Sequence, residues 1–181
     1  MIKTFKEHTP RIDDSAFIAE TAVVIGDVVT GRHANTWYGV TIRGDINHVE
    51  IGEEVNIQEN SVVHVDSKCD DPAFGRTIIG KRVTIGHGAI IHACHIEEDC
   101  LIGMGAIVLS GAHIGRGSII GAGAVVKEGQ VIPPNSLAAG VPAVVKAAVA
   151  EEKIAGLRKH AAHYWELSEE HRQHSKTICP S

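Results

Sequence analysis

Aliphatic residues recur every six positions along most of this chain, and many of them are followed by glycine. The clearest run consists of Ile79, Ile85, Ile91, Ile96, Ile102, Val108, Ile114, Ile120, Val126 and Ile132. Four residues after most of these stands a small or aliphatic side chain. A period of six fits neither the three-to-four spacing of a helix nor simple alternation. It predicts short strands joined by tight corners, with the aliphatic side chain inside.

The N-terminal half carries a weaker version of the pattern, at Ile12, Ile18, Val24, Thr30, Thr36, Ile42, Ile51, Ile57 and Val63. Three steps are irregular. The step from Ile42 has three extra residues, and the step from Ile91 is one residue short. The step from Val63 to Ile79 has ten extra residues, whose polar, Pro- and Gly-containing composition predicts a loop.

After the repeats, the composition changes to one typical of a helix. From about Ala147 to Gln173 the chain is rich in Ala, Glu, Lys and Leu, which predicts an amphipathic helix. We expect it to pack along the outside of the repeats through four apolar or aromatic side chains: Leu157, Tyr164, Trp165 and Leu167.

Composition supports a core of small side chains. The 181 residues include 19 glycines but only three Phe, two Trp and two Tyr, as expected of a stacked solenoid. The net charge of −5 argues against nucleic-acid binding, and no apolar run is long enough to span a bilayer. The start of the chain lacks a signal-peptide core, and the cysteines (Cys69, Cys94, Cys100, Cys179) lack CxxC spacing. We therefore expect a cytoplasmic protein with free thiols.

The repeat resembles that of the hexapeptide-repeat proteins, in which three hexapeptides form one triangular coil. This resemblance implies an all-β fold: a left-handed parallel β-helix over residues 10–145, with a C-terminal α-helical segment over residues 146–174 packed against it. Successive coils would stack at strand-pairing distance, roughly 4.8 Å.

Counting the repeats in threes assigns each position to a face. One face receives Val24, Ile42, Val63, Ile91, Val108 and Val126; the preceding face receives Ile18, Thr36, Ile57, Ile85, Ile102 and Ile120. The outward residues that follow then form a ladder of Arg43, His64 and His92. On the preceding face, Gln58 lies one coil below His87.

Two histidines one strand spacing apart can supply two nitrogens to one Zn²⁺ or Fe²⁺. His87 faces away from His64 and His92 within one subunit, but a three-fold neighbour could present it to them. The alternative is chance stacking, because the chain has 12 histidines and a single exposed histidine usually has no function. The combined ladder favours a metal site.

Three segments resemble motifs of the gamma-class carbonic anhydrases, in the same order along the chain. They are TWYGVTIRGD (36–45), NIQENSVVH (56–64) and IGHGAIIHAC (85–94). The resemblance implies reversible hydration of CO₂ to bicarbonate by a homotrimer. His64 and His92 of one subunit and His87 of the next would bind Zn²⁺, Fe²⁺ or Co²⁺.

The same resemblance implies further residue roles. Arg43 and Asp45 would form an ion pair at the subunit interface. Gln58 would orient the attacking hydroxide, and Asn56 would support Gln58. Tyr164 matches a tyrosine that many bacterial members place near the metal.

The chain departs from the most active members at the positions used for proton transfer. Ile46 stands where those members carry a glutamate, and the loop after His64 offers only Asp66, Asp70 and Asp71. The segment AAHY (161–164) lacks an asparagine found in some members. We therefore expect slow hydration.

Three other functions stay open. Hydrolysis of an acyl-CoA thioester could use the same metal site, and a non-catalytic accessory or assembly subunit is compatible with the missing shuttle. Acyl transfer usually relies on a histidine without metal and on an acyl-donor cleft, so the three motifs argue against it.

Overall fold

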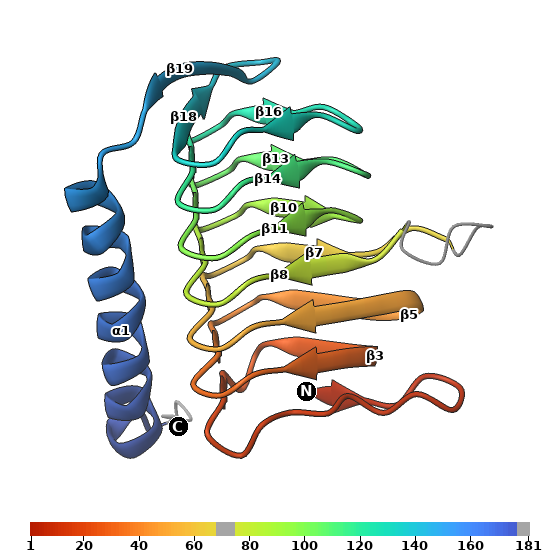
Figure 1. Ribbon diagram of the computed structural model, residues 1–181. Helices are drawn as coiled ribbons and strands as arrows, with labels where there is room; N and C mark the ends of the chain where they lie inside the picture. Colours follow the sequence, from red (N-terminus) through yellow and green to blue (C-terminus); the bar gives the residue numbers. More distant parts are fainter. Residues whose placement is uncertain (68–74, 177–181) are drawn as a thin grey trace, which may run out of the picture.

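The computed structural model describes residues 1–67 and 75–176, and it is a β-solenoid with one helix along its side (Figure 1). Within these residues the sheet facing the helix has eight strands: β2 (Phe17–Ile18), β4 (Asn35–Thr36), β6 (Asn56–Ile57), β9 (Thr84–Ile85), β12 (Leu101–Ile102), β15 (Ile119–Ile120), β18 (Ser136–Ala139) and β19 (Val144–Ala148). The other sheet bends around the remaining faces and has eleven: β1 (Ile2–Lys3), β3 (Val23–Thr30), β5 (Thr41–Ile51), β7 (Val62–His64), β8 (Thr77–Ile79), β10 (Ile90–His92), β11 (His95–Ile96), β13 (Ile107–Val108), β14 (His113–Ile114), β16 (Val125–Val126) and β17 (Val131–Ile132).

The predicted register of the coils is confirmed. Val24 pairs with Ile42, Ile42 with Val63, Val63 with Ile91, and Ile91 with Val108, all in parallel. The face under the helix follows the second predicted row, for example Ile57 beside Ile85. The inward aliphatic side chains of both rows form one continuous buried core. The hexapeptide-repeat fold predicted from the sequence is therefore present.

The irregular steps lie where the sequence placed them. Gly26 pairs with Gly44, but two residues later Val28 pairs with Val49, so β5 accommodates three extra residues in between. These residues project Asp45 and the exposed Ile46 from the coil. Residues 68–74 of the predicted loop after Val63 lie outside the described residues, as do Cys69, Asp70 and Asp71.

Two glycines allow the tight turn that precedes β10. A Cβ on Gly86 would lie 2.7 Å from the backbone nitrogen of Met104, because adjacent coils approach closely at this corner. Gly88 has φ +67°, a left-handed conformation that costs glycine little. Together they let the chain carry His87 around the corner and continue into the strand that ends at His92.

Helix α1 (Glu151–His174) runs back along the stack from the last coil toward the first (Figure 1). It begins four residues later than the sequence predicted, because Val144–Ala148 forms β19 and pairs antiparallel with β18. Of the four side chains expected at the interface, Leu157 is buried, while Tyr164, Trp165 and Leu167 are half-buried. Trp165 stacks on His33 with ring centroids 4.2 Å apart.

Two further sequence expectations can be compared with the described residues. Cys94 and Cys100 are free and buried, and burial raises the pKa of each thiol to about 12. Cys179 lies outside the described residues. In the part of the chain that the structure describes, no helix has the length and apolar character needed to cross a membrane.

Asp99 ties α1 to the solenoid. It accepts hydrogen bonds from Arg82 at 2.7 Å and from Arg158 of α1 at 2.9 Å, and its side chain is only 6% exposed. Burial raises the pKa of Asp99, but the hydrogen bonds from both arginines outweigh it and hold that pKa below its ordinary value.

We predict that Asp99→Ala lowers the free energy of unfolding by about 3 kcal/mol, because it leaves Arg82 without its buried partner. Urea unfolding at neutral pH measures this loss. The matched control is Glu169→Ala, which removes the exposed partner of Arg172 and should cost under about 1 kcal/mol. Equal effects of the two substitutions would contradict the prediction.

Candidate functional site

His64 and His92 lie on adjacent coils of the solenoid and face each other. Their strands pair in parallel with His64 opposite His92, and the imidazole centroids are 5.2 Å apart. Nδ1 of His64 lies 3.3 Å from Nε2 of His92. The histidine ladder predicted by counting coils is thus present, with Arg43 paired on the next coil below.

Asp45 orients the first histidine. Its carboxylate lies 3.1 Å from Nε2 of His64 and 2.5 Å from the guanidinium of Arg43. Burial raises the pKa of Asp45, but the hydrogen bonds from His64 and Arg43 keep it below its ordinary value. An ionised Asp45 accepts the Nε2 proton of His64, so the free lone pair of that ring is on Nδ1.

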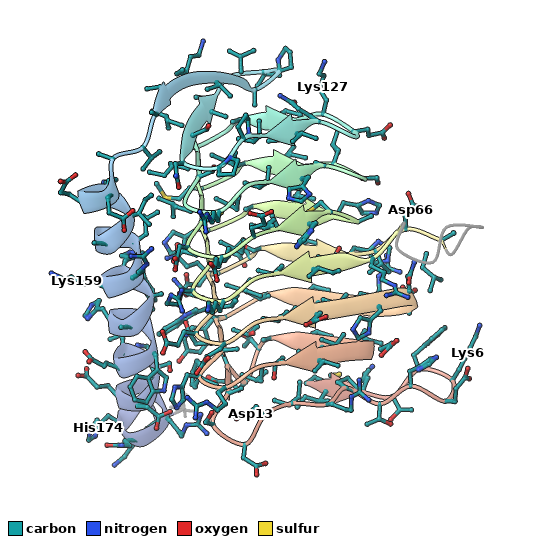
Figure 2. The ribbon with its side chains drawn as sticks, in the orientation of Figure 1. Lys6, Asp13, Asp66, Lys127, Lys159 and His174 are labelled. Carbon is teal, nitrogen blue, oxygen red and sulfur yellow. The ribbon has the colours of Figure 1, made fainter. Side chains whose placement is uncertain are left out.

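Ser110 orients the second histidine, and sequence reasoning missed it. Its hydroxyl donates to Asp66 at 3.3 Å, so its oxygen is the acceptor for Nδ1 of His92 at 2.9 Å. Since Nδ1 of His92 then carries the proton, the free lone pair of that ring is on Nε2. Figure 2 shows Asp66 on the side of the solenoid away from α1.

With the rings oriented in this way, the lone pair on Nδ1 of His64 points at the lone pair on Nε2 of His92 across 3.3 Å. This arrangement is unfavourable unless a cation lies between the two nitrogens. A proton is a poor candidate, because burial lowers the pKa of His64, and Arg43 and His92 lower it further against the opposing effect of Asp45. A metal ion fits better. Two nitrogens at ordinary zinc distances in a tetrahedral site lie about 3.3 Å apart.

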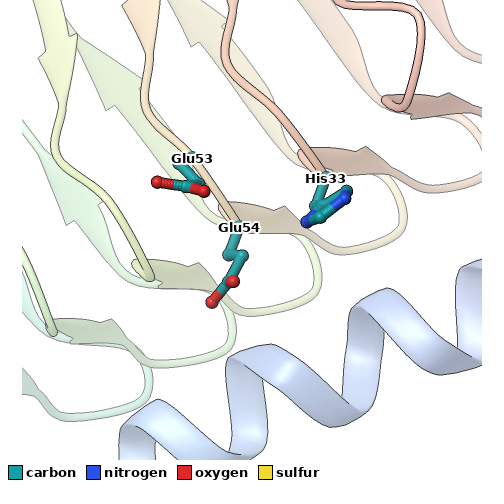
Figure 3. A group of neighbouring side chains, drawn as sticks. All are labelled: His33, Glu53 and Glu54. Atoms are coloured by element: carbon teal, nitrogen blue, oxygen red, sulfur yellow. The ribbon is translucent and has the colours of Figure 1, made fainter.

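His87 lies apart from this pair. It follows β9 at the corner beside the helix-facing sheet, it is exposed, and its Nδ1 lies 2.6 Å from Glu59. Among the described residues of one chain, the three histidines do not form a group whose ligand atoms lie close enough together to hold one metal ion. The group that does so consists of His33, Glu53 and Glu54 at the coil corners beside α1 (Figure 3).

That corner group has other partners. Glu53 accepts a 2.7 Å hydrogen bond from Arg32, and His33 stacks on Trp165. The stacking makes His33 part of the packing of α1 on the solenoid, while the ion pair joins Glu53 to Arg32 on the neighbouring coil.

His87 shares a cavity of about 400 Å³ with two other predicted site residues, Gln58 and Tyr164. Gln58 is buried, and burial together with Glu59 raises the pKa of Tyr164. The rest of the lining is largely apolar and comes from the coils above, including Leu101, Met104 and Ile119; α1 adds His160.

Asn56 is fully buried, and neither polar atom of its side chain has a hydrogen-bond partner among the described residues. Its expected support of Gln58 is therefore not a contact of the single chain and stays a prediction.

Two of the residues that sequence reasoning missed could have been found by continuing the register. Ile57 pairs with Ile85, so Glu59 lies one coil below His87, and a carboxylate beside His87 follows from counting. Ser110 lies one coil above Ala93 by the same argument, since the N–H of Gly111 donates to the Ala93 carbonyl. His160 could not be found this way, because its position depends on how α1 packs.

Comparisons with known proteins agree with the hexapeptide-repeat fold. The family model described as bacterial transferase hexapeptide (six repeats) matches residues 93–128. A probable carbonic anhydrase of Methanocaldococcus jannaschii is 49% identical over 87% of this chain and 96% of its own length. A carbonic anhydrase of Geobacillus kaustophilus is 41% identical over 99% of this chain and 96% of its own.

Other relatives broaden the comparison. The mitochondrial gamma carbonic anhydrase 1 of Arabidopsis thaliana is 40% identical over 91% of this chain, which spans 60% of that protein's length. A solved structure from Anaplasma phagocytophilum, titled a hexapeptide transferase family protein, has TM-score 0.86 and 40% identity over 93% of this chain and 96% of its own.

The lowered pKa of His64 predicts a pH dependence of stability in the metal-free protein. Below about pH 6.5 the unfolded chain binds a proton at this histidine while the folded chain does not. The free energy of unfolding therefore decreases as the pH is lowered. His95 and His160 have lowered pKa values too and add to the slope. Urea unfolding between about pH 7.5 and pH 5.5 should show this fall, and His64→Gln should make it shallower. An unchanged slope in that variant would contradict the assignment.

Proposed function

Because this chain belongs to the gamma carbonic anhydrase family of hexapeptide-repeat proteins, we propose that it is a metal-dependent enzyme that reversibly hydrates CO₂ to bicarbonate. The observation that carries the proposal is the pair of facing nitrogens on His64 and His92. Asp45 fixes the first ring, and Ser110, which is hydrogen-bonded to Asp66, fixes the second. Metal-binding histidines usually have such hydrogen-bonded partners.

The proposed site is completed by a second subunit. A catalytic metal site needs a third protein ligand, and His87 is proposed to supply it from a neighbouring copy in a homotrimer. An aliphatic row supports contact on this face: Val62 and Ile90, two residues before the metal histidines, are 38% and 40% exposed. Exposed aliphatic side chains in register are suited to burial between symmetric copies.

The chain's own residues then have distinct tasks. A bound Zn²⁺, Fe²⁺ or Co²⁺ would supply Lewis acidity, which lowers the pKa of a coordinated water to about 7. The buried amide of Gln58 can hydrogen-bond the attacking oxygen and direct it toward the carbon of CO₂. Arg43, which is exposed beside the histidines, attracts the bicarbonate anion, while its pairing with Asp45 keeps that carboxylate ionised for His64.

Hydrolysis of an acyl-CoA thioester is the second candidate, and the cavity beside His87 favours it. About 400 Å³ lined largely by aliphatic side chains is far more than a three-atom substrate needs, but it suits an acyl chain. Parallel assays of CO₂ hydration and acyl-CoA hydrolysis on metal-loaded protein separate the two functions.

The cytoplasm is the proposed compartment. Cys94 and Cys100 are buried free thiols, which agrees with a reducing environment. Localisation of the tagged protein in its own cell would test this.

We predict that the purified trimer binds about one metal ion per chain and that His64→Ala and His92→Ala lose most of it while staying folded. Elemental analysis measures the metal, light scattering the mass, and circular dichroism the fold. His113→Ala is the matched control, because His113 is also on a solenoid strand but pairs with Glu97. Full metal occupancy in both site variants, or metal bound to a monomer, would contradict the proposed site.

We predict slow CO₂ hydration that is limited by proton transfer. The isoleucine at position 46 is exposed beside Asp45 but cannot carry a proton, so small imidazole buffers should raise turnover. Ile46→Glu should increase kcat more than kcat/KM, and stopped-flow assays at several buffer concentrations measure both. Metal-loaded trimer without hydration at any buffer concentration would refute the anhydrase proposal and leave the thioesterase or an accessory subunit.

A further inference from the structure

Hydration of CO₂ releases one proton in every cycle, and the attacking water must pass it to a group that exchanges with solvent. Ile46, which is exposed beside Asp45, cannot accept a proton. A relay group must come from another element that reaches the site.

His160 on α1 lies in the position that such a group needs. It lines the same cavity as Gln58, His87 and Tyr164. Its ring is 4.9 Å from that of Tyr164, and its Nδ1 lies 3.4 Å from the hydroxyl of Thr84. Because Thr84 engages Nδ1, Nε2 is the nitrogen available for proton transfer. The residue is also exposed, so it can exchange protons with bulk water.

The charges around His160 favour the neutral ring, which is the form that can accept a proton. Partial burial lowers the pKa of His160, and His163 and Lys153 on the same helix lower it further. From the solenoid, the charged and titratable groups around this cavity are His87 and Glu59, which hydrogen-bond each other. The raised pKa of Tyr164 makes the phenol a poor acceptor near neutral pH.

We propose that His160 is the proton relay of this enzyme, an inference that rests on the proposed hydration of CO₂. Before CO₂ binds, the attacking water gives one proton to Nε2 of neutral His160, and the hydroxide that remains then adds to the carbon of CO₂ to form bicarbonate. The imidazolium then releases the proton to buffer, so that CO₂ and water yield bicarbonate and one proton. His160 acts in the cavity that contains His87 of its own chain.

The kinetic test uses the metal-loaded trimer. His160→Ala should lower kcat at low buffer concentration at least about tenfold and leave kcat/KM within about twofold. The reason is that the substitution slows only the removal of a proton from the next water, and not the addition to CO₂. Added imidazole should restore the lost turnover. The matched control is His174→Ala, an exposed histidine 14 residues further along α1, or about 21 Å along the helix axis. It should behave like wild type.

A second measurement does not depend on activity. In trimer loaded with paramagnetic Co²⁺, the imidazole proton signals of His160 should be broadened or shifted strongly, and those of His174 should not. Metal analysis of His160→Ala should give the wild-type content. Loss of metal, or a fall in kcat/KM as large as that in kcat, would show that His160 has a structural task and overturn the relay.

The outcomes separate the relay from the function on which it rests. An active wild type whose kcat is unchanged by His160→Ala overturns the relay alone, as does an unaffected His160 signal in the Co²⁺ trimer. A metal-loaded wild type that hydrates no CO₂ at any buffer concentration overturns the proposed function and the relay with it.

Discussion

The register of backbone pairing between successive coils is the constraint on which the rest of this molecule depends. Each short strand must satisfy its N–H and C=O groups with the coils above and below, so a residue in one coil has a fixed neighbour in the next. The buried aliphatic rows hold that register, since a slip of one residue would expose them. The facing of His64 and His92 is a direct result of this register.

Register brings the two histidines together, but electrostatics gives the pair its chemical character. The carboxylates of Asp45 and Asp66, the latter through Ser110, fix which nitrogen of each ring is protonated. The result is two acceptor atoms at the spacing that a metal ion requires. A surface histidine pair without such partners could rotate or protonate, and would then hold a cation less well.

The separation of His87 from His64 and His92 within one chain also has a physical basis. A triangular coil turns its outward side chains in different directions, so residues that follow β9 and residues that end β10 cannot converge within one chain. His87 therefore lies with Gln58, Tyr164 and His160 in the cavity beside α1, while His64 and His92 lie on another face. Symmetric copies are a simple way to bring such separated groups together.

Much of the fold was determined by the sequence itself, because a six-residue period is a local property that fixes strand, corner and stacking together. Counting in threes gave the pairing of Arg43, His64 and His92, and the irregular step after Ile42 appeared as the three extra residues of β5. The family motifs likewise named Gln58 and His87, whose roles stay predictions. The pairing predictions worked because coil register converts sequence separation directly into distance.

Only the tertiary structure decided what depends on side-chain direction and on the packing of α1. The first residues of the predicted helix form β19 instead, since they can pair with the unpaired edge of β18. The meeting of His160 on α1 with Thr84 of the solenoid crosses 76 residues. No periodic pattern encodes such contacts, because a helix packed on a solenoid brings side chains together by its place and rotation rather than by a repeat.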